Sequence, residues 1–213
     1  MTFNEKEILN MFQGFNFKSI FDDSRVDELV LYLFDKGYVF DYDFGATKLV
    51  IIPHNKDYVI KIPFQGYYED SFCYFTNANS DSDFDWDYCY VEAERYYDIC
   101  STRFKKFFAE TIFIGYVDDY PIYLQEKCTP FNNSYKKAKE KTVKMDSFLQ
   151  KHHCYYDLNT DWCIDLLKYC GPKKFKEFLA LIKKLKWDDD LTYDNVGYKD
   201  GHPIIIDFSG FRE

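Results

Sequence analysis

The stretch Asp57-Tyr58-Val59-Ile60-Lys61-Ile62-Pro63 is typical of a β-strand that carries one charge among apolar residues. β-Branched and aromatic side chains favour an extended, pleated backbone. If Lys61 lies on a buried face, its ammonium group needs an anionic partner. Strand alternation equally allows Lys61 to point outward, opposite to Ile60 and Ile62. Residues 57–63 therefore predict a strand and leave the direction of Lys61 open.

Two more strands are expected directly before this stretch. Tyr38 to Phe44 and Lys48 to Ile52 are rich in β-branched and aromatic residues, and Gly45 interrupts them. The turn residues Pro53-His54-Asn55-Lys56 separate the second run from Asp57 to Pro63. Together these runs predict a three-stranded antiparallel meander.

The segment before the meander has helical character. Apolar residues recur at helical spacing from Asp27 to Phe34, and Gly37 follows as a C-terminal cap. We expect residues 1–36 to form a helical N-terminal extension.

The chain after the meander first becomes irregular and then regular again. Residues 65–87 are polar, acidic and without a sustained period, which predicts a long loop inserted in the domain. Tyr88 to Cys100 predicts a helix. Thr111 to Tyr116 and Pro121 to Gln125 predict a second hairpin, which completes a sheet of about five strands.

The second half is expected to be mainly helical. Helices are predicted over Lys136 to Lys151, over Asp161 to Cys170 and, after a break at Gly171-Pro172, up to Lys186. A turn from Tyr193 to Gly197 and a β-run from Pro203 to Phe208 follow. The whole chain is thus predicted to be α+β.

Composition and charge narrow the classes of function. The 213 residues are 46% hydrophobic and 30% charged, as in a packed globular protein, and include 20 Tyr and 22 Phe. A net charge of −9 argues against general nucleic-acid binding. The lysine-rich stretch Lys173 to Lys186 is either a solvated helix face or a local site for RNA or polyphosphate.

The cysteines and the hydropathy pattern indicate the compartment. Seven cysteines without a C-x-x-C pair are typical of reduced thiols in the cytosol. His152-His153-Cys154 lacks the second cluster that a tetrahedral zinc site needs. Met1 to Leu9 is charged where a signal peptide is apolar, and no apolar run approaches the roughly 20 residues of a membrane span. We expect a cytoplasmic protein without a membrane partner.

Three oxygen-bearing side chains near the carboxy terminus suggest a metal site. Asp190 and Asn195 flank a short loop, and Asp207 follows the apolar run Ile204-Ile205-Ile206. Mg²⁺ prefers carboxylate and amide oxygens and commonly bridges to phosphates. Aspartate and asparagine are also common turn residues, so a purely structural role is the alternative.

The order of these parts resembles the protein kinase-like fold. The spacing Asp190-x-x-x-x-Asn195, followed by Asp207-Phe208-Ser209-Gly210, is similar to the catalytic loop and the metal-binding turn of that family. The resemblance implies an N-lobe over residues 37–127, with a five-stranded antiparallel sheet, one helix and the acidic insertion 65–87. It implies a minimal helical C-lobe over residues 128–213.

The resemblance also implies roles in nucleotide binding. Gly45 and Val50 match the glycine-rich loop, and Lys61 matches the strand lysine that contacts phosphates. Glu92 matches the helix glutamate that pairs with this lysine, with Glu94 as the second choice. The segment Leu124 to Cys128 matches the hinge beside the adenine, which makes Glu126 and Cys128 nucleotide-binding residues.

An active protein of this kind would be a phosphotransferase that uses ATP or GTP. Asn195 and Asp207 would hold Mg²⁺, Lys61 would contact the phosphates, and Asp190 would orient the acceptor hydroxyl. The acceptor, a protein or a small molecule, is not identified by the sequence. Aminoglycoside and choline kinase-type phosphotransferases share this skeleton.

Departures from the family pattern support an alternative. Asp188 stands where the family usually has histidine, and only one of three loop glycines is kept. Because the sequence given stops at Glu213, shortly after Asp207, we expect no activation segment. Small kinase-like proteins of bacterial viruses are similar in this respect. The alternative is a pseudokinase that binds or inhibits another protein, such as a host factor. Apolar surface on the short helical half would be covered by that partner or by a second copy of the chain.

Overall fold

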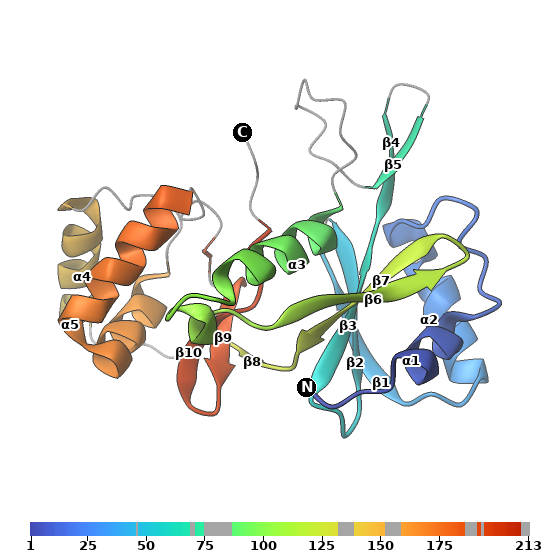
Figure 1. Ribbon diagram of the computed structural model, residues 1–213, viewed down its shortest axis with the longest axis horizontal. Helices are drawn as coiled ribbons and strands as arrows, with labels where there is room; N and C mark the ends of the chain where they lie inside the picture. The colour runs from blue at the N-terminus through green and yellow to red at the C-terminus, as the bar shows by residue number, and fades with distance from the viewer. Residues whose placement is uncertain are drawn as a thin grey trace. The chain divides into compact units, whose positions relative to one another are not determined.

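The computed structural model (Figure 1) describes residues 1–45, 47–68, 71–74, 87–131, 139–151, 159–185, 191–192 and 194–209 of an α+β chain. The chain forms two compact units. The first unit comprises Met1–Tyr97 and Glu110–Lys127, and the second comprises Asp98–Ala109 and Cys128–Glu213.

The first unit is built on a five-stranded sheet in the order β1-β2-β3-β7-β6, in which all neighbours are antiparallel. The strands are β1 (Phe40–Phe44), β2 (Lys48–Pro53), β3 (Tyr58–Pro63), β6 (Thr111–Val117) and β7 (Tyr120–Glu126). The predicted meander and the five-stranded antiparallel sheet are confirmed. The turn between β2 and β3 contains Asn55 with a positive φ of 58°, a conformation that asparagine tolerates well.

The register gives this sheet two different faces. Val50 of β2 lies opposite Lys61 of β3, which in turn lies opposite Tyr123 of β7. Because residues directly opposite each other on neighbouring strands point to the same side of a sheet, these three residues share one face. We call it the charged face, and its members also include Lys48 and Gln125. The other, apolar face carries Leu49, Ile51, Ile60, Ile62, Ile122 and Leu124.

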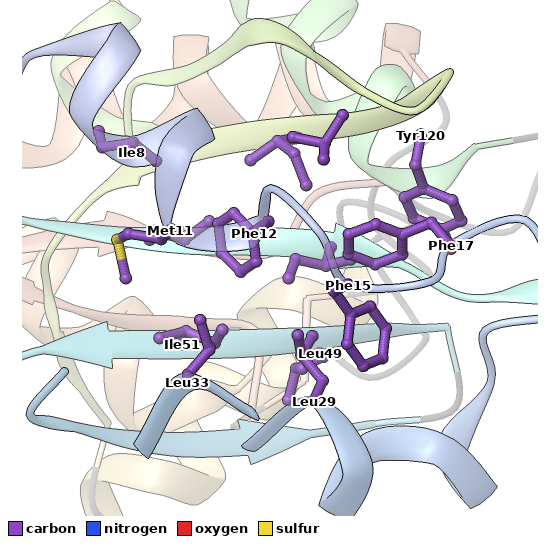
Figure 2. Packing of buried hydrophobic residues seen from close by; sticks show 14 of the residues in the cluster. Ile8, Met11, Phe12, Phe15, Phe17, Leu29, Leu33, Leu49, Ile51 and Tyr120 are labelled. Atoms are coloured by element: carbon purple, nitrogen blue, oxygen red, sulfur yellow. The ribbon is translucent and has the colours of Figure 1, made fainter. Parts of the chain in front are cut away.

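Two N-terminal helices cover the apolar face. The helices α1 (Glu5–Phe12) and α2 (Val26–Asp35) flank a loop that contains the short 3₁₀ helix η1 (Asp23–Arg25). Their buried side chains form one cluster with the sheet (Figure 2), which includes Ile8, Met11, Phe12, Leu29, Leu33, Leu49 and Ile51. The helical character expected for residues 1–36 is therefore present, and this segment shares the hydrophobic core of the first unit.

Specific contacts hold the N-terminal segment in place. The Arg25 guanidinium donates to the backbone carbonyls of Asn16 and Ile20, both at 3.1 Å. Gly115, with φ of 143°, lets α1 approach β6 closely, since a Cβ atom there would lie 2.9 Å from Leu9 Cδ1. These contacts order a segment that would otherwise retain its conformational entropy.

The stretch after β3 differs from the predicted loop. Gln65–Tyr68 (β4) and Ser71–Tyr74 (β5) form an antiparallel hairpin. Aromatic residues at 67, 68, 72 and 74 favour strands. The two strands have only four residues each, too few to produce a sustained period over 65–87, so the predicted loop is wrong here. Residues 75–86 of the expected acidic loop lie outside the described residues. The helix α3 (Tyr88–Ile99) follows and confirms the predicted helix.

The second unit combines helices with a small sheet. Its helices are α4 (Lys139–Lys151), α5 (Thr160–Leu185) and the 3₁₀ helix η2 (Lys105–Phe107). The predicted break in α5 is confirmed, because Gly171 has non-helical angles (φ 77°, ψ 163°) directly before Pro172. The apolar residues of α5 after the kink pack inward: Phe175, Phe178, Leu179 and Ile182 are buried.

The small sheet of the second unit has the order β10-β9-β8, with bounds Thr129–Pro130 (β8), Val196–Lys199 (β9) and His202–Ile205 (β10). The turn predicted from Tyr193 to Gly197 is wrong at its end, because Val196 and Gly197 belong to β9. The reason for the strand is tertiary: Gly197 lies so close to Thr129 that a Cβ atom would be 2.4 Å from its carbonyl oxygen. Only glycine permits this approach of β8 and β9.

Candidate functional site

Lys61 lies inside the first unit and forms an ion pair with Glu92. Its side chain is 4% exposed, and its Nζ lies 2.6 Å from Glu92 Oε2, whose side chain is fully buried. Glu94 lies on the exposed side of the same helix. Of the two directions that alternation allowed for Lys61 and the two glutamates considered as its partner, the structure has the inward direction and Glu92.

A second lysine, Lys48 of β2, contacts the other oxygen of the same carboxylate. Its Nζ donates to Glu92 Oε1, and its side chain is 6% exposed. Sequence analysis missed Lys48. The signal was available, because Lys48 precedes Val50 by two residues and therefore shares its strand face. Once Val50 is paired opposite Lys61, the two lysines must point to the same side of the sheet.

Two neutral side chains also lie beside Glu92. Gln125 Nε2 lies 3.4 Å from Glu92 Oε2 and donates to Thr111 Oγ1 at 2.8 Å. Strands β2, β3, β6 and β7 thus all contribute to the environment of one carboxylate on α3. We call Lys48, Lys61, Glu92, Gln125 and Thr111 the lysine–glutamate cluster. Within the described residues, every buried side-chain nitrogen and oxygen atom has a hydrogen-bond partner.

Asp87 fixes the beginning of α3 next to this cluster. Its Oδ1 accepts hydrogen bonds from the backbone N–H groups of Cys89 (2.8 Å) and Tyr90 (3.0 Å), which is the arrangement of a helix N-cap. The Tyr123 hydroxyl donates to Asp87 Oδ2 at 2.5 Å. Burial raises the pKa of Asp87, and the hydrogen bond from Tyr123, the two backbone N–H groups and the positive charge of Lys48 oppose this only in part.

The same burial affects the two neighbours of Asp87. Desolvation, with the adjacent Asp87 charge, raises the pKa of Tyr123, so that this hydroxyl stays a hydrogen-bond donor at neutral pH. Desolvation also raises the pKa of the fully buried Cys89 thiol. A buried thiol that stays protonated is a poor nucleophile.

Of the two residues expected to form the glycine-rich loop, Gly45 directly follows β1 and Val50 lies within β2. Gly45 is exposed, and its N–H donates to the Lys48 carbonyl at 3.1 Å, which closes the turn between β1 and β2. A Cβ atom on Gly45 would meet nothing within 4 Å. Val50 is half-buried and lies directly opposite Lys61.

The expected hinge follows directly from β7. Glu126 is the last residue of that strand, and its N–H donates to the Glu110 carbonyl at 2.9 Å. The N–H of Lys127 donates to the Asp57 carbonyl at 2.8 Å. Cys128, the other expected nucleotide-binding residue here, is half-buried and belongs to the second unit.

The second unit brings Asn195 and Asp207 next to each other. The Asn195 carbonyl accepts hydrogen bonds from the N–H groups of Ile206 (2.9 Å) and Asp207 (3.2 Å). Asp207 Oδ1 accepts from the Ser209 hydroxyl at 3.0 Å. The part of the second unit that the structure describes contains no group of three His, Cys, Asp or Glu that could hold a metal. The backbones of the two residues are thus in contact, and their side chains, a carboxylate and an amide, are oxygen ligands of the kind that Mg²⁺ takes.

Other sequence expectations lie partly outside the described residues. These include Asp190, Asp188 and the stretch His152-His153-Cys154. The lysines on the last part of α5 are accessible: Lys173, Lys176, Lys183 and Lys184 are exposed. This exposure agrees with a solvated helix face.

Comparison of the chain with protein-family models and with curated protein sequences finds no match. Among the helices that the structure describes, none combines the length and the apolar character needed to span a bilayer.

Proposed function

We propose that this protein binds a nucleoside triphosphate together with Mg²⁺ and transfers a phosphoryl group to a hydroxyl. One observation carries the proposal: Glu92 holds Lys61 inside the first unit, with Lys61 Nζ 2.6 Å from Glu92 Oε2. The resemblance of the chain to the protein kinase-like fold and the proximity of Asn195 and Asp207 in the second unit support it.

Energetics explain why such a pair indicates function. Removing two charges from water costs several kcal/mol per ion, and their attraction often fails to offset this cost completely. Apolar residues of similar volume would pack at least as well. Buried charged groups of this kind occur where a protein needs a charge at a fixed place, which makes them markers of functional sites.

The residues can be assigned to separate tasks. Lys61 contacts the phosphates, and Glu92 fixes the direction of its ammonium group. The open space at Gly45 allows the backbone of the β1–β2 turn to approach a phosphate. In the second unit, Asn195 and Asp207 would hold Mg²⁺, which when bound neutralises phosphate charge. Asp190 would accept the proton of the acceptor hydroxyl.

Nucleotide binding is tested by thermal unfolding with and without ATP and Mg²⁺. The ligand stabilises only the folded state, so we expect the midpoint to rise in the wild type. The magnesium-dependent part of this rise should be lost in Asp207→Asn. Asp200→Asn is the matched control, because Asp200 is exposed in the β9–β10 turn, and asparagine tolerates its positive φ of 48°.

Phosphoryl transfer needs its own measurement. Release of ADP from ATP and labelling of a protein or small-molecule acceptor by the γ-phosphate should both depend on Lys61 and Asp207. A folded wild type whose unfolding midpoint does not respond to ATP and Mg²⁺ would contradict the proposal. Binding without hydrolysis or transfer would favour the alternative, a pseudokinase that acts by binding another protein.

A further inference from the structure

The role of Lys48 is not covered by the function proposed above. Both oxygens of the Glu92 carboxylate are contacted by ammonium groups, Oε1 by Lys48 and Oε2 by Lys61. The two lysines come from adjacent strands, β2 and β3. Glu92 therefore does not depend on Lys61 alone for its orientation.

The burial of Glu92 determines what happens when one of its two lysines moves away. Glu92 has no exposed side-chain surface, so water cannot replace an ammonium group that moves away. If Lys61 turns toward a phosphate, its contact with Glu92 weakens. Lys48 is itself 6% exposed and remains on Oε1, so the carboxylate keeps a positive charge beside it.

We propose that Lys48 is a positioning residue that keeps the Glu92 carboxylate oriented and its charge balanced while Lys61 contacts the nucleotide phosphates. The inference rests on the proposed nucleotide site. In this role Lys48 keeps α3 attached to the sheet in both the free and the bound protein, because the Lys48–Glu92 contact joins β2 to α3 in each state.

This role differs from direct phosphate binding in one measurable respect. A positioning residue acts through Glu92, so its effect on nucleotide affinity must disappear when the Glu92 carboxylate is replaced by a neutral group. A lysine that contacts phosphate itself would keep its effect in any background. A double-mutant cycle between Lys48 and Glu92 separates the two roles.

The experiment measures the affinity for ATP and Mg²⁺ by titration calorimetry. We expect Lys48→Met to weaken binding about tenfold or more, as supporting residues around a binding site do. Lys48→Arg, which keeps the charge and the donors, should recover most of this loss. In the Glu92→Gln background, Lys48→Met should have no further effect. Lys56→Met, at an exposed lysine of the same unit, should bind as the wild type does.

Two outcomes would overturn the inference. One is wild-type affinity in a folded Lys48→Met variant. The other is an equal loss of affinity from Lys48→Met with and without Glu92→Gln, which would make Lys48 a direct phosphate contact. If Lys48→Met does not fold, Lys48→Gln takes its place, because glutamine keeps a donor for Glu92 and lacks the charge.

A nucleotide-free measurement separates this inference from the proposed function. Amide hydrogen exchange of α3 should be as slow in Lys61→Met as in the wild type, since Lys48 still holds Glu92. It should be at least about tenfold faster in Lys48→Met/Lys61→Met. Equally fast exchange in Lys61→Met and in the double variant would refute the holding role. If the wild type binds no nucleotide, the proposed function fails, and this measurement alone decides whether Lys48 holds α3.

Discussion

The two faces of the five-stranded sheet differ in the chemistry of their buried side chains. The apolar face packs Leu49, Ile51, Ile60 and Ile62 against α1 and α2, and its cluster consists of hydrophobic side chains (Figure 2). The charged face packs Lys48 and Lys61 around Glu92 of α3. These four apolar side chains and the side chains of Lys48, Lys61 and Glu92 are all buried, so the difference lies in the chemistry and not in access to water.

The difference suggests that the two faces have different roles. Hydrophobic burial stabilises the fold directly, at about 25 cal/mol per Å² of apolar surface removed from water. A buried ion cluster contributes little net stability, yet removing its shared carboxylate leaves two ammonium groups buried without their counter-charge and strongly destabilises the fold. The apolar face therefore accounts for folding, and the charged face calls for a further reason, which we take to be phosphate binding.

Breaking the apolar face should have the largest effect. Phe12 is fully buried in the cluster between α1 and the sheet. Phe12→Ala removes its packing and leaves a cavity, so the free energy of unfolding should fall by about 3 to 5 kcal/mol. Urea denaturation measures this change. Phe3→Ala, at a phenylalanine that is 38% exposed, is the matched control and should change stability by less than about 1 kcal/mol.

Breaking the charged face at its centre should have an effect of similar size. Glu92→Leu leaves the ammonium groups of Lys48 and Lys61 buried without the carboxylate between them, which costs about 3 to 5 kcal/mol of unfolding free energy. Glu94→Leu changes an exposed glutamate of the same helix and should stay within about 0.5 kcal/mol of the wild type. Equal stabilities of the two variants would show that the cluster is not buried as described.

Replacing the whole charged cluster should have a much smaller effect on stability. In Lys48→Met/Lys61→Met/Glu92→Leu no buried charge of this cluster is left behind. Apolar replacement of a buried ion cluster is often neutral or stabilising, so the free energy of unfolding should return to within about 1 kcal/mol of the wild type. ATP should no longer bind to this variant. A triple variant as unstable as Glu92→Leu alone would mean that the charges themselves stabilise the fold.

The smallest expected effect is a pH dependence at Asp87. Burial raises the pKa of Asp87 in the folded protein above its ordinary value of 3.8, so folding favours the protonated carboxyl. This contribution is fully present below the unfolded pKa and is lost as pH rises through the folded pKa. Compared with Asp87→Asn, the wild type should therefore lose stability as the pH rises above 3.8. The measurement is urea denaturation of both proteins across this range.

The control for this pH series is Asp98→Asn, at an exposed aspartate near the end of α3. The sign of the difference decides the result. If the wild type gains stability over Asp87→Asn as the pH rises, the hydrogen bonds from Tyr123 and from the N–H groups of Cys89 and Tyr90 outweigh burial.

Much of the sheet could be predicted from the sequence because its strands carry local signals. The runs around Lys61 and Val50 are β-branched, and their turns contain glycine, proline and asparagine. Glu92 could be predicted as the partner of Lys61 from the family pattern. Lys48 was missed because its importance depends on register: only the pairing of Val50 with Lys61 shows that both lysines reach one carboxylate.

Other features could not be predicted from local patterns. The strand β9 forms because Gly197 allows the backbone of Thr129 to approach, a contact between residues far apart in the sequence. The packing of residues 1–36 on the sheet depends on the complementarity of two apolar surfaces, which helical periodicity alone does not identify. Long-range contacts of this kind override local propensity.

The most direct test of the account measures the affinity for ATP and Mg²⁺ by titration calorimetry in the wild type, Lys61→Met and Lys56→Met. The account predicts binding by the wild type and by Lys56→Met, and a loss of at least about tenfold in Lys61→Met, which is 1.4 kcal/mol or more. Equal affinities of folded Lys61→Met and wild type would contradict the claim that the buried charged face exists to bind phosphate.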